Sequence, residues 1–222
     1  MTVLDKLAST LHRRDEVPNQ LLAREIARSK DKRAVKELIN NLSHKDKRVQ
    51  SDCIKVLYEI GEREPNLIAN YYQEFGKLLG NNNNRLVWGA MTALDAIALH
   101  EPKGVYGLLG TILAAADAGS VITRDHAVGI LVKLATLKQY ADKCFPLLTE
   151  QLLACPNNQL PMYAEMALAA ATDRNKAALE KALAKRLAGL DKESQKKRVR
   201  KVLKRLSSPS VGFTPQFPSA RA

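Results

Sequence analysis

A block of about 37 residues recurs along this chain, and this period constrains the fold more than any other feature of the sequence. The segment RVQSDCIKVLYEIG begins at Arg48, and the similar segment RLVWGAMTALDAIA begins at Arg85. Corresponding positions carry apolar or small side chains at helical spacing: Val49 and Leu86, Cys53 and Ala90, Val56 and Ala93, Leu57 and Leu94, Ile60 and Ile97. This period predicts helix-pair units that stack and cover one another's apolar stripes. Stacked units build extended surfaces, which usually bind partners rather than catalyse reactions.

The same register extends along most of the chain. It predicts buried second-helix positions at Thr123, Ala127, Ile130, Leu131 and Leu134, and again at Leu160, Ala164, Ala167, Leu168 and Ala171. It predicts buried first-helix columns of Val35, Tyr72, Leu109, Pro146 and Leu183, and of Leu42, Leu79, Ala116, Leu153 and Leu190. The last unit needs a turn about two residues longer to bury Val199, Leu203 and Leu206. A shortened opening unit would bury Leu4, Leu7 and Leu11.

These columns predict an all-α solenoid of about five to six antiparallel helix pairs. We expect one elongated repeat domain over residues 1–206, with a degenerate N-terminal unit at 1–30 and a capping unit at 174–206. Turn-forming residues lie between the two helices of each unit, as at Ser43–Asp46 and Asn81–Asn84. From residue 207 to 222 the helical stripe is lost among prolines and serines, so we expect a disordered tail.

The second helix of the unit that begins near Asp46 carries a family resemblance. The run Asp46-Lys47-Arg48-Val49, followed by Cys53 and Leu57, resembles the second helix of a HEAT repeat. The HEAT resemblance, which covers about residues 3–206, implies a right-handed superhelix whose second helices line a concave inner face. HEAT proteins mostly act as scaffolds or adaptors, so the resemblance implies capture of a protein or peptide segment on that face.

Positive charge is concentrated at one end of the chain. The formal net charge is +12, and residues 174–206 carry 13 basic and 3 acidic groups, whereas residues 67–173 carry 7 basic and 9 acidic groups. A protein that followed a long duplex with its whole length would spread its positive charge instead. The basic residues of the last predicted helix are Lys196, Lys197, Arg198, Arg200, Lys201, Lys204 and Arg205.

Two interpretations of this basic helix stay open. It is a solvated cap that charge keeps soluble, or it binds an acidic protein, nucleic acid or another polyanion. No aromatic residue lies among the basic residues, which argues against base stacking. The segment Lys197-Arg198-Val199-Arg200 also fits a short nuclear-import pattern.

A second candidate surface comes from second-helix positions that point away from the core. In register with Ser51 and Lys55, these positions are Trp88, Asp125 and Met162, and Thr92, Gly129 and Met166. We expect Trp88, Met162, Tyr163 and Met166 to be exposed or half-exposed partner-binding residues on the inner face, since Trp, Tyr and Met are enriched at interfaces. The alternative is that Trp88 only fills space between units.

Catalytic motifs are absent from the sequence. The four histidines are isolated, and no zinc spacing, phosphate-binding glycine loop or nucleophile elbow occurs, so we expect no enzyme, cofactor or metal. One HEAT-like branch contains DNA glycosylases, for which Trp88, Tyr163, Asp95 and Asp125 are the candidate residues, but the acidic middle region opposes DNA.

The remaining features concern location. Three scattered cysteines predict reduced structural thiols and a cytoplasmic protein, or a nuclear one in a eukaryote. We expect neither a secretory signal nor a membrane span, because no apolar stretch is long enough. The sequence does not set the oligomeric state.

Overall fold

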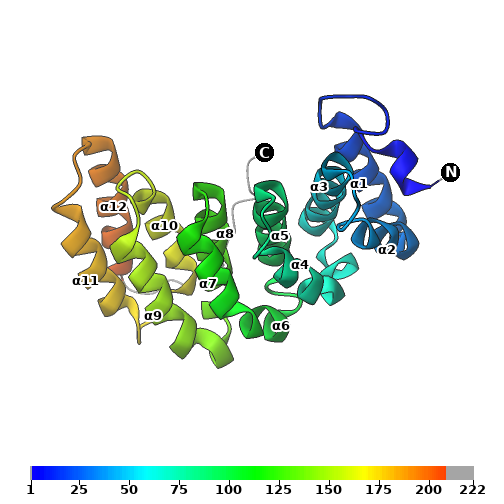
Figure 1. The fold of residues 1–222 in the computed structure, drawn as a ribbon. Helices are drawn as coiled ribbons and strands as arrows, with labels where there is room; N and C mark the ends of the chain where they lie inside the picture. Colours follow the sequence, from blue (N-terminus) through cyan, green and yellow to red (C-terminus); the bar gives the residue numbers. More distant parts are fainter. Residues whose placement is uncertain (1, 209–222) are drawn as a thin grey trace. The chain divides into compact units, whose positions relative to one another are not determined.

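The computed structural model describes residues 2–208, which form α-helices and four short 3-10 helices but no strand (Figure 1). The predicted all-α fold class is therefore confirmed. The chain divides into two compact units, the first ending at Ala127 and the second beginning at Val128. The boundary lies within helix α8 (Val121–Ala135). The expected single domain over residues 1–206 stays a prediction, and residues 209–222 of the expected tail lie outside the described residues.

The first unit is built around a row of three helices that we call the α1/α3/α5 row. α3 (Lys47–Arg63) packs against both α1 (Val17–Ser29) and α5 (Asn84–Ile97). α2 (Lys32–Asn40) packs on α3, and α4 (Tyr72–Leu78) packs on α5, which completes two helix pairs. The short helices α6 (Pro102–Gly107) and α7 (Leu109–Ala118) follow. This row corresponds to the second helices that the repeat predicts.

The second unit repeats the same packing scheme with four further helices. α9 (Lys138–Ala154) contacts α11 (Lys176–Leu187), and α10 (Leu160–Ala167) contacts α12 (Glu193–Leu206). Within each pair, α9 contacts α10 and α11 contacts α12. First helices therefore pack on first helices and second helices on second helices, as the repeat predicts.

Most of the predicted columns are buried. The fully shielded members include Cys53, Val56, Leu57, Ile60, Ala90, Ala93, Leu94, Ile97, Ile130, Leu131, Leu134, Leu160, Ala164 and Ala167. All three cysteines are buried free thiols, as expected of structural residues. Burial raises the pKa of the Cys53 thiol to about 12 and that of Cys144 to about 11, which keeps both thiols protonated.

The register prediction is wrong in α9, where Pro146 and Leu153 are exposed. Phe145, Leu148 and Leu152 are buried in their place, which corresponds to a rotation of the helix by about one residue. These three side chains form a continuous apolar stripe at helical spacing. Pro146 consequently lies on the solvent-exposed side of the helix.

The prediction is also wrong at the start of the chain. Leu7 is buried, but Leu11 is 49% exposed and Leu4 is only half-buried. A single 3-10 turn over Val3–Lys6 replaces the expected helix, and the chain then enters a loop in which His12 has a φ of 55°. A residue in this left-handed conformation ends any helical register. Leu11 therefore has no core to join.

Polar caps fix where α3 and α5 begin. Asp46 accepts a hydrogen bond of 2.8 Å from the backbone N–H of Arg48, and Asn83 accepts one of 3.1 Å from that of Arg85. Each cap satisfies an N–H group that has no partner within its own helix. The predicted turns at Ser43–Asp46 and Asn81–Asn84 are thus confirmed.

A glycine allows α3 and α5 to approach closely. A Cβ atom at Gly89 of α5 would lie 2.6 Å from Cγ1 of Ile54 on α3, which is too close for any other residue without a shift. This close approach lets the neighbouring Trp88 side chain reach α3.

None of the helices in the described part of the chain combines the length and the apolar character that a membrane span requires.

The core assignment predicts a large effect of truncating Leu94, which is fully buried in the middle of α5. Leu94→Ala removes buried methyl groups and leaves a cavity, so we expect it to lower the free energy of unfolding by about 2–5 kcal/mol. Denaturant unfolding monitored by circular dichroism measures the change. The matched control is Leu99→Ala, whose side chain is already 37% exposed. Equal effects of the two variants would contradict the assignment.

Candidate binding surface

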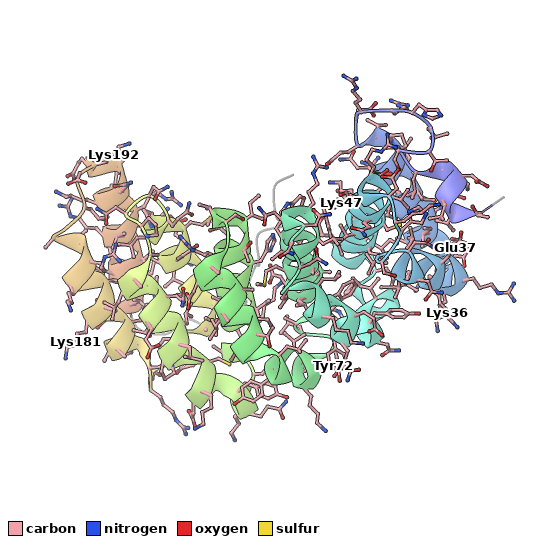
Figure 2. All side chains as sticks on the ribbon, viewed as in Figure 1. Lys36, Glu37, Lys47, Tyr72, Lys181 and Lys192 are labelled. Carbon is pink, nitrogen blue, oxygen red and sulfur yellow. The ribbon has the colours of Figure 1, made fainter. Side chains whose placement is uncertain are left out.

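A groove of about 570 Å³ lies at the end of the α1/α3/α5 row where α3 and α5 begin. Its walls come from the loop that spans residues 8–16, from the first half of α3 and from the first residues of α5. Figure 2 shows Lys47, which lines the groove, at the end of α3 nearer to this loop. All lining residues belong to the first unit.

The start of the loop is held by a buried amide and a carboxylate. The Asn19 side chain on α1, 1% exposed, accepts a 3.0 Å hydrogen bond from the backbone N–H of Ala8. The Asp52 carboxylate on α3 accepts bonds of 2.7 Å from both the Ser9 backbone N–H and the Asn19 amide. Because these bonds join three segments, they fix the loop against both helices.

The other end of the loop is held by a shared lysine. Lys55 Nζ on α3 lies 2.9 Å from carboxylate oxygens of both Glu16 and Glu59. Arg63 Nη1 lies 2.6 Å from the second oxygen of Glu59, so that buried carboxylate has two cationic partners. Burial alone would raise the pKa of Glu59, but hydrogen bonds from Lys55 and Arg63 outweigh it and hold the pKa below its usual range.

Burial would likewise lower the pKa of Lys55, yet its contacts with Tyr58, Glu16 and Glu59 raise this pKa above its ordinary value. Lys55 therefore stays charged throughout the physiological range. This permanent cation is what links the loop to α3.

An aromatic pair continues from this lysine along the row. Lys55 Nζ lies 4.8 Å from the centroid of the Tyr58 ring, and the Tyr58 and Trp88 centroids are 5.7 Å apart with ring planes tilted by 52°. Tyr58 is buried, which raises the pKa of its hydroxyl to about 12, whereas Trp88 stays half-buried. We call these residues the Lys55–Tyr58–Trp88 cluster. The Trp88 indole is partly exposed and rests against the buried Tyr58 ring, which in turn contacts the Lys55 ammonium group.

The structure gives the exposure of the predicted inner-face residues, while their role in binding a partner stays a prediction. Trp88 of the first unit, and Met162 and Met166 of the second, are half-exposed as expected. Tyr163 is only 1% exposed, so the expectation that it offers a surface is wrong. Its position is three residues after Leu160 and four before Ala167, which places it in the buried stripe of α10.

The basic residues of α12 surround the predicted apolar stripe. Val199, Val202 and Leu206 are buried, Leu203 is half-buried, and the basic side chains face outward except for the half-buried Lys196. Two arginines of α12 pair with carboxylates of the described residues: Arg198 binds Glu165 at 2.6 and 2.8 Å, and Arg200 binds Glu193. The hydrogen bonds to Glu165 raise the pKa of Arg198 above its ordinary value.

The lysines of α12 differ from its arginines. Among the described residues, no ion pair engages the ammonium groups of Lys196, Lys197, Lys201 and Lys204. The sequence pattern alone could not separate these lysines from the paired arginines.

The groove itself was not predicted from the sequence. Arg48 and Arg85 occupy the same position of two successive units, and this pair of basic residues was the visible sign of the groove in the sequence. The loop residues carry no such sign, because the bonds from Asn19 and Asp52 join segments outside the periodic pattern.

Two features bear on catalysis. His126 Nδ1 lies 2.9 Å from Asp95 Oδ2, and both side chains are mostly buried. Asp95, a candidate acidic residue for the glycosylase alternative, is therefore already paired with a histidine. No cluster of three or more His, Cys, Asp or Glu side chains suited to a metal ion occurs within residues 2–208.

Comparisons with known proteins bear on the fold. The sequence matches no family model and no curated protein. A designed armadillo repeat protein in complex with the peptide (KR)4 is similar in structure, with a TM-score of 0.64 at 17% identity over 92% of this chain and 98% of that chain. Computationally designed armadillo repeat proteins for modular peptide recognition give a TM-score of 0.63 at 17% identity, over 91% of this chain and 97% of theirs.

An engineered protein gives a TM-score of 0.61 at 22% identity, over 94% of this chain and all of its own. The chain has the fold of an armadillo/HEAT-like helical-repeat solenoid. The likeness concerns the fold, since identity is low throughout.

The lysine shared by Glu16 and Glu59 leads to a prediction about pH. Lys55→Met leaves the buried Glu59 carboxylate with Arg63 alone and should lower the free energy of unfolding by about 1–3 kcal/mol at pH 7. Since the folded pKa of Glu59 lies below its ordinary value of 4.5, its contribution to stability is present above that pH and is lost as the pH falls through the folded pKa.

The difference in the free energy of unfolding between wild type and Lys55→Met should therefore be largest near neutral pH and should become smaller in acid. Denaturant unfolding at pH 7 and near pH 3.5 measures both gaps. A control is Lys45→Met, an exposed lysine outside this cluster. A gap that is constant with pH would show that the Glu59 charge is not what Lys55 balances.

Proposed function

We propose that this protein is a non-catalytic scaffold that captures a segment of a partner protein. The proposal places one contact surface on the α1/α3/α5 row of the first unit. The observation that carries it is the Lys55–Tyr58–Trp88 cluster, which leaves a large apolar ring half-exposed on a rigid row of helices. Tryptophan anchors of this kind supply much of the binding energy at protein interfaces.

The surroundings of Trp88 suit a binding anchor. Its backbone carbonyl accepts a hydrogen bond from Thr92, and its ring rests against the buried Tyr58. Because the anchor is already ordered, little side-chain entropy is lost when a partner covers it. Trp88 packs against Tyr58 of α3 and is also partly exposed, so it fills space between the helices and remains accessible to a partner.

Solved structures of similar fold support the coarse part of the proposal. One designed neighbour is a complex with a peptide, and another was designed for modular peptide recognition. In the second unit, the half-exposed Met162 and Met166 of α10 are proposed as further contacts, since flexible methionine side chains adapt to varied partners. A cytoplasmic or nuclear location stays a prediction.

Trp88 is the only tryptophan of the chain, so its fluorescence reports directly on this surface. Titration with peptide pools of basic, neutral and acidic composition should shift the emission for at least one pool. Trp88→Ala should weaken binding of that pool, measured by anisotropy of labelled peptide, roughly tenfold, or about 1–2 kcal/mol.

Leu99→Ala, another partly exposed apolar residue, is the matched control and should leave the affinity unchanged. Circular dichroism of both variants checks that they fold. Equal affinities of Trp88→Ala and wild type would remove the anchor from the proposal, and no binding of any pool would contradict capture of a peptide.

The second candidate function is binding of a polyanion, such as nucleic acid, to α12. The observation in its favour is the set of α12 lysines without ion pairs in the described part of the chain. Binding through such lysines releases counterions and weakens steeply with salt. Changing Lys197, Lys201 and Lys204 together to Ala should lower the salt dependence of single-stranded oligonucleotide binding by about two units of log–log slope.

The control changes Arg24, Arg28 and Lys36 to Ala, which removes three exposed charges from the first unit. Filter binding between about 50 and 200 mM salt gives both slopes. If the two variants lose affinity equally, net charge rather than α12 governs the interaction.

A further inference from the structure

The groove beside α3 and α5 has a charge pattern that specifies a kind of ligand. Cationic side chains of its lining, six in number, outnumber the three anionic ones: Arg13, Arg14, Lys47, Arg48, Lys55 and Arg85 against Asp15, Glu16 and Asp52. The net charge of the residues that line the groove is therefore positive. What a ligand meets depends on which of these charges are already engaged within the protein.

The carboxylates of the groove are engaged from inside. Asp52 accepts the Ser9 N–H and the Asn19 amide, and Glu16 pairs with Lys55. Asp15 pairs with Arg13 at 2.9 Å, and hydrogen bonds from that arginine hold the pKa of Asp15 below its usual range. Each carboxylate of the lining therefore already has a partner within the protein.

Three cations of the lining have no such partner. Arg14 comes from the loop, Lys47 from α3 and Arg85 from α5, and each is exposed. Within residues 2–208, none of the three forms an ion pair. Three separate elements therefore direct unneutralised positive charge at one groove, and the positive ends of the α3 and α5 dipoles add to the field there.

We infer that this groove binds an acidic segment of a partner protein. The inference deepens the proposed function and rests on it. Arg85 and Trp88 are three residues apart on α5, so both lie on one side of that helix. A segment whose carboxylates meet Arg14, Lys47 and Arg85 can continue along α5 and cover the Trp88 ring.

Three features of the groove favour a peptide over nucleic acid. Its lining contains no Phe, Tyr or Trp on which a base could stack. The lining also contains three carboxylates beside its cations, which would repel a continuous run of phosphates more than the spaced charges of a peptide. A volume of about 570 Å³ also holds a few side chains rather than a duplex.

The test uses the full chain and a labelled eight-residue peptide in which glutamate alternates with serine. The same peptide with glutamine in place of glutamate is the uncharged probe. Fluorescence anisotropy should give at least tenfold tighter binding of the acidic peptide at low salt, with affinity falling as salt rises. Changing Arg14, Lys47 and Arg85 together to Glu should weaken that binding at least tenfold.

The matched control changes Arg24, Arg28 and Lys36 to Glu, which alters net charge equally but lies outside the groove lining. We expect less than a twofold effect from it, and a thermal melt confirms that both variants fold. Equal losses in the two variants, or no loss in either, would overturn the inference.

Two further outcomes separate this inference from the function on which it rests. If the glutamine peptide binds as tightly as the glutamate peptide and still depends on Trp88, the groove inference fails and peptide capture stands. If an eight-nucleotide single strand binds this groove more tightly than the acidic peptide, and Arg14, Lys47 and Arg85 govern it, the protein class of the ligand is wrong. If neither peptide binds while one of the peptide pools does, the groove inference fails and peptide capture stands.

Discussion

The contact between α3 and α5 is the interaction on which the first unit depends. α3 is packed on both sides, by α1 and by α5, and its buried face includes Cys53, Val56, Leu57 and Ile60. The absence of a side chain at Gly89 lets Ile54 press against the α5 backbone. This spacing brings the first turns of the two helices together, and with them the capped N-termini that border the groove. It also sets the distance across which Tyr58 and Trp88 meet.

The periodic part of the molecule could be predicted from the sequence, because burial repeats with the helix-pair unit. The columns through Leu57, Leu94, Leu131 and Leu168 are buried as the period predicts. The prediction is wrong where another local pattern overrides the period. In α9, the stripe of Phe145, Leu148 and Leu152 outweighs the register of Pro146 and Leu153, and in α10 the spacing from Leu160 carries Tyr163 into the core.

The candidate site was only half predictable, for a related reason. Trp88 was found because its position in the repeat points away from the core. The groove depends instead on bonds across 11, 33 and 43 residues, from Asn19 to Ala8, from Asn19 to Asp52 and from Ser9 to Asp52. These hydrogen bonds do not recur with the helix-pair repeat, so the repeat could not reveal them. Likewise, the number of basic residues is plain in the sequence, but whether each cation faces a carboxylate is a property of the folded chain.

The two-ended anchoring of the loop has a consequence for how this surface can diversify. Its backbone is fixed at Ser9 by Asp52 and near Glu16 by Lys55, and both partners lie on α3 rather than in the loop. The stretch between these anchors, residues 10–15, is exposed throughout and contributes nothing to the core. Substitutions in this stretch should therefore change the proposed groove with little loss of folding stability, as in the variable loops of other rigid frameworks. Within the loop, the residues that would meet a ligand are not the ones that hold the backbone on α3.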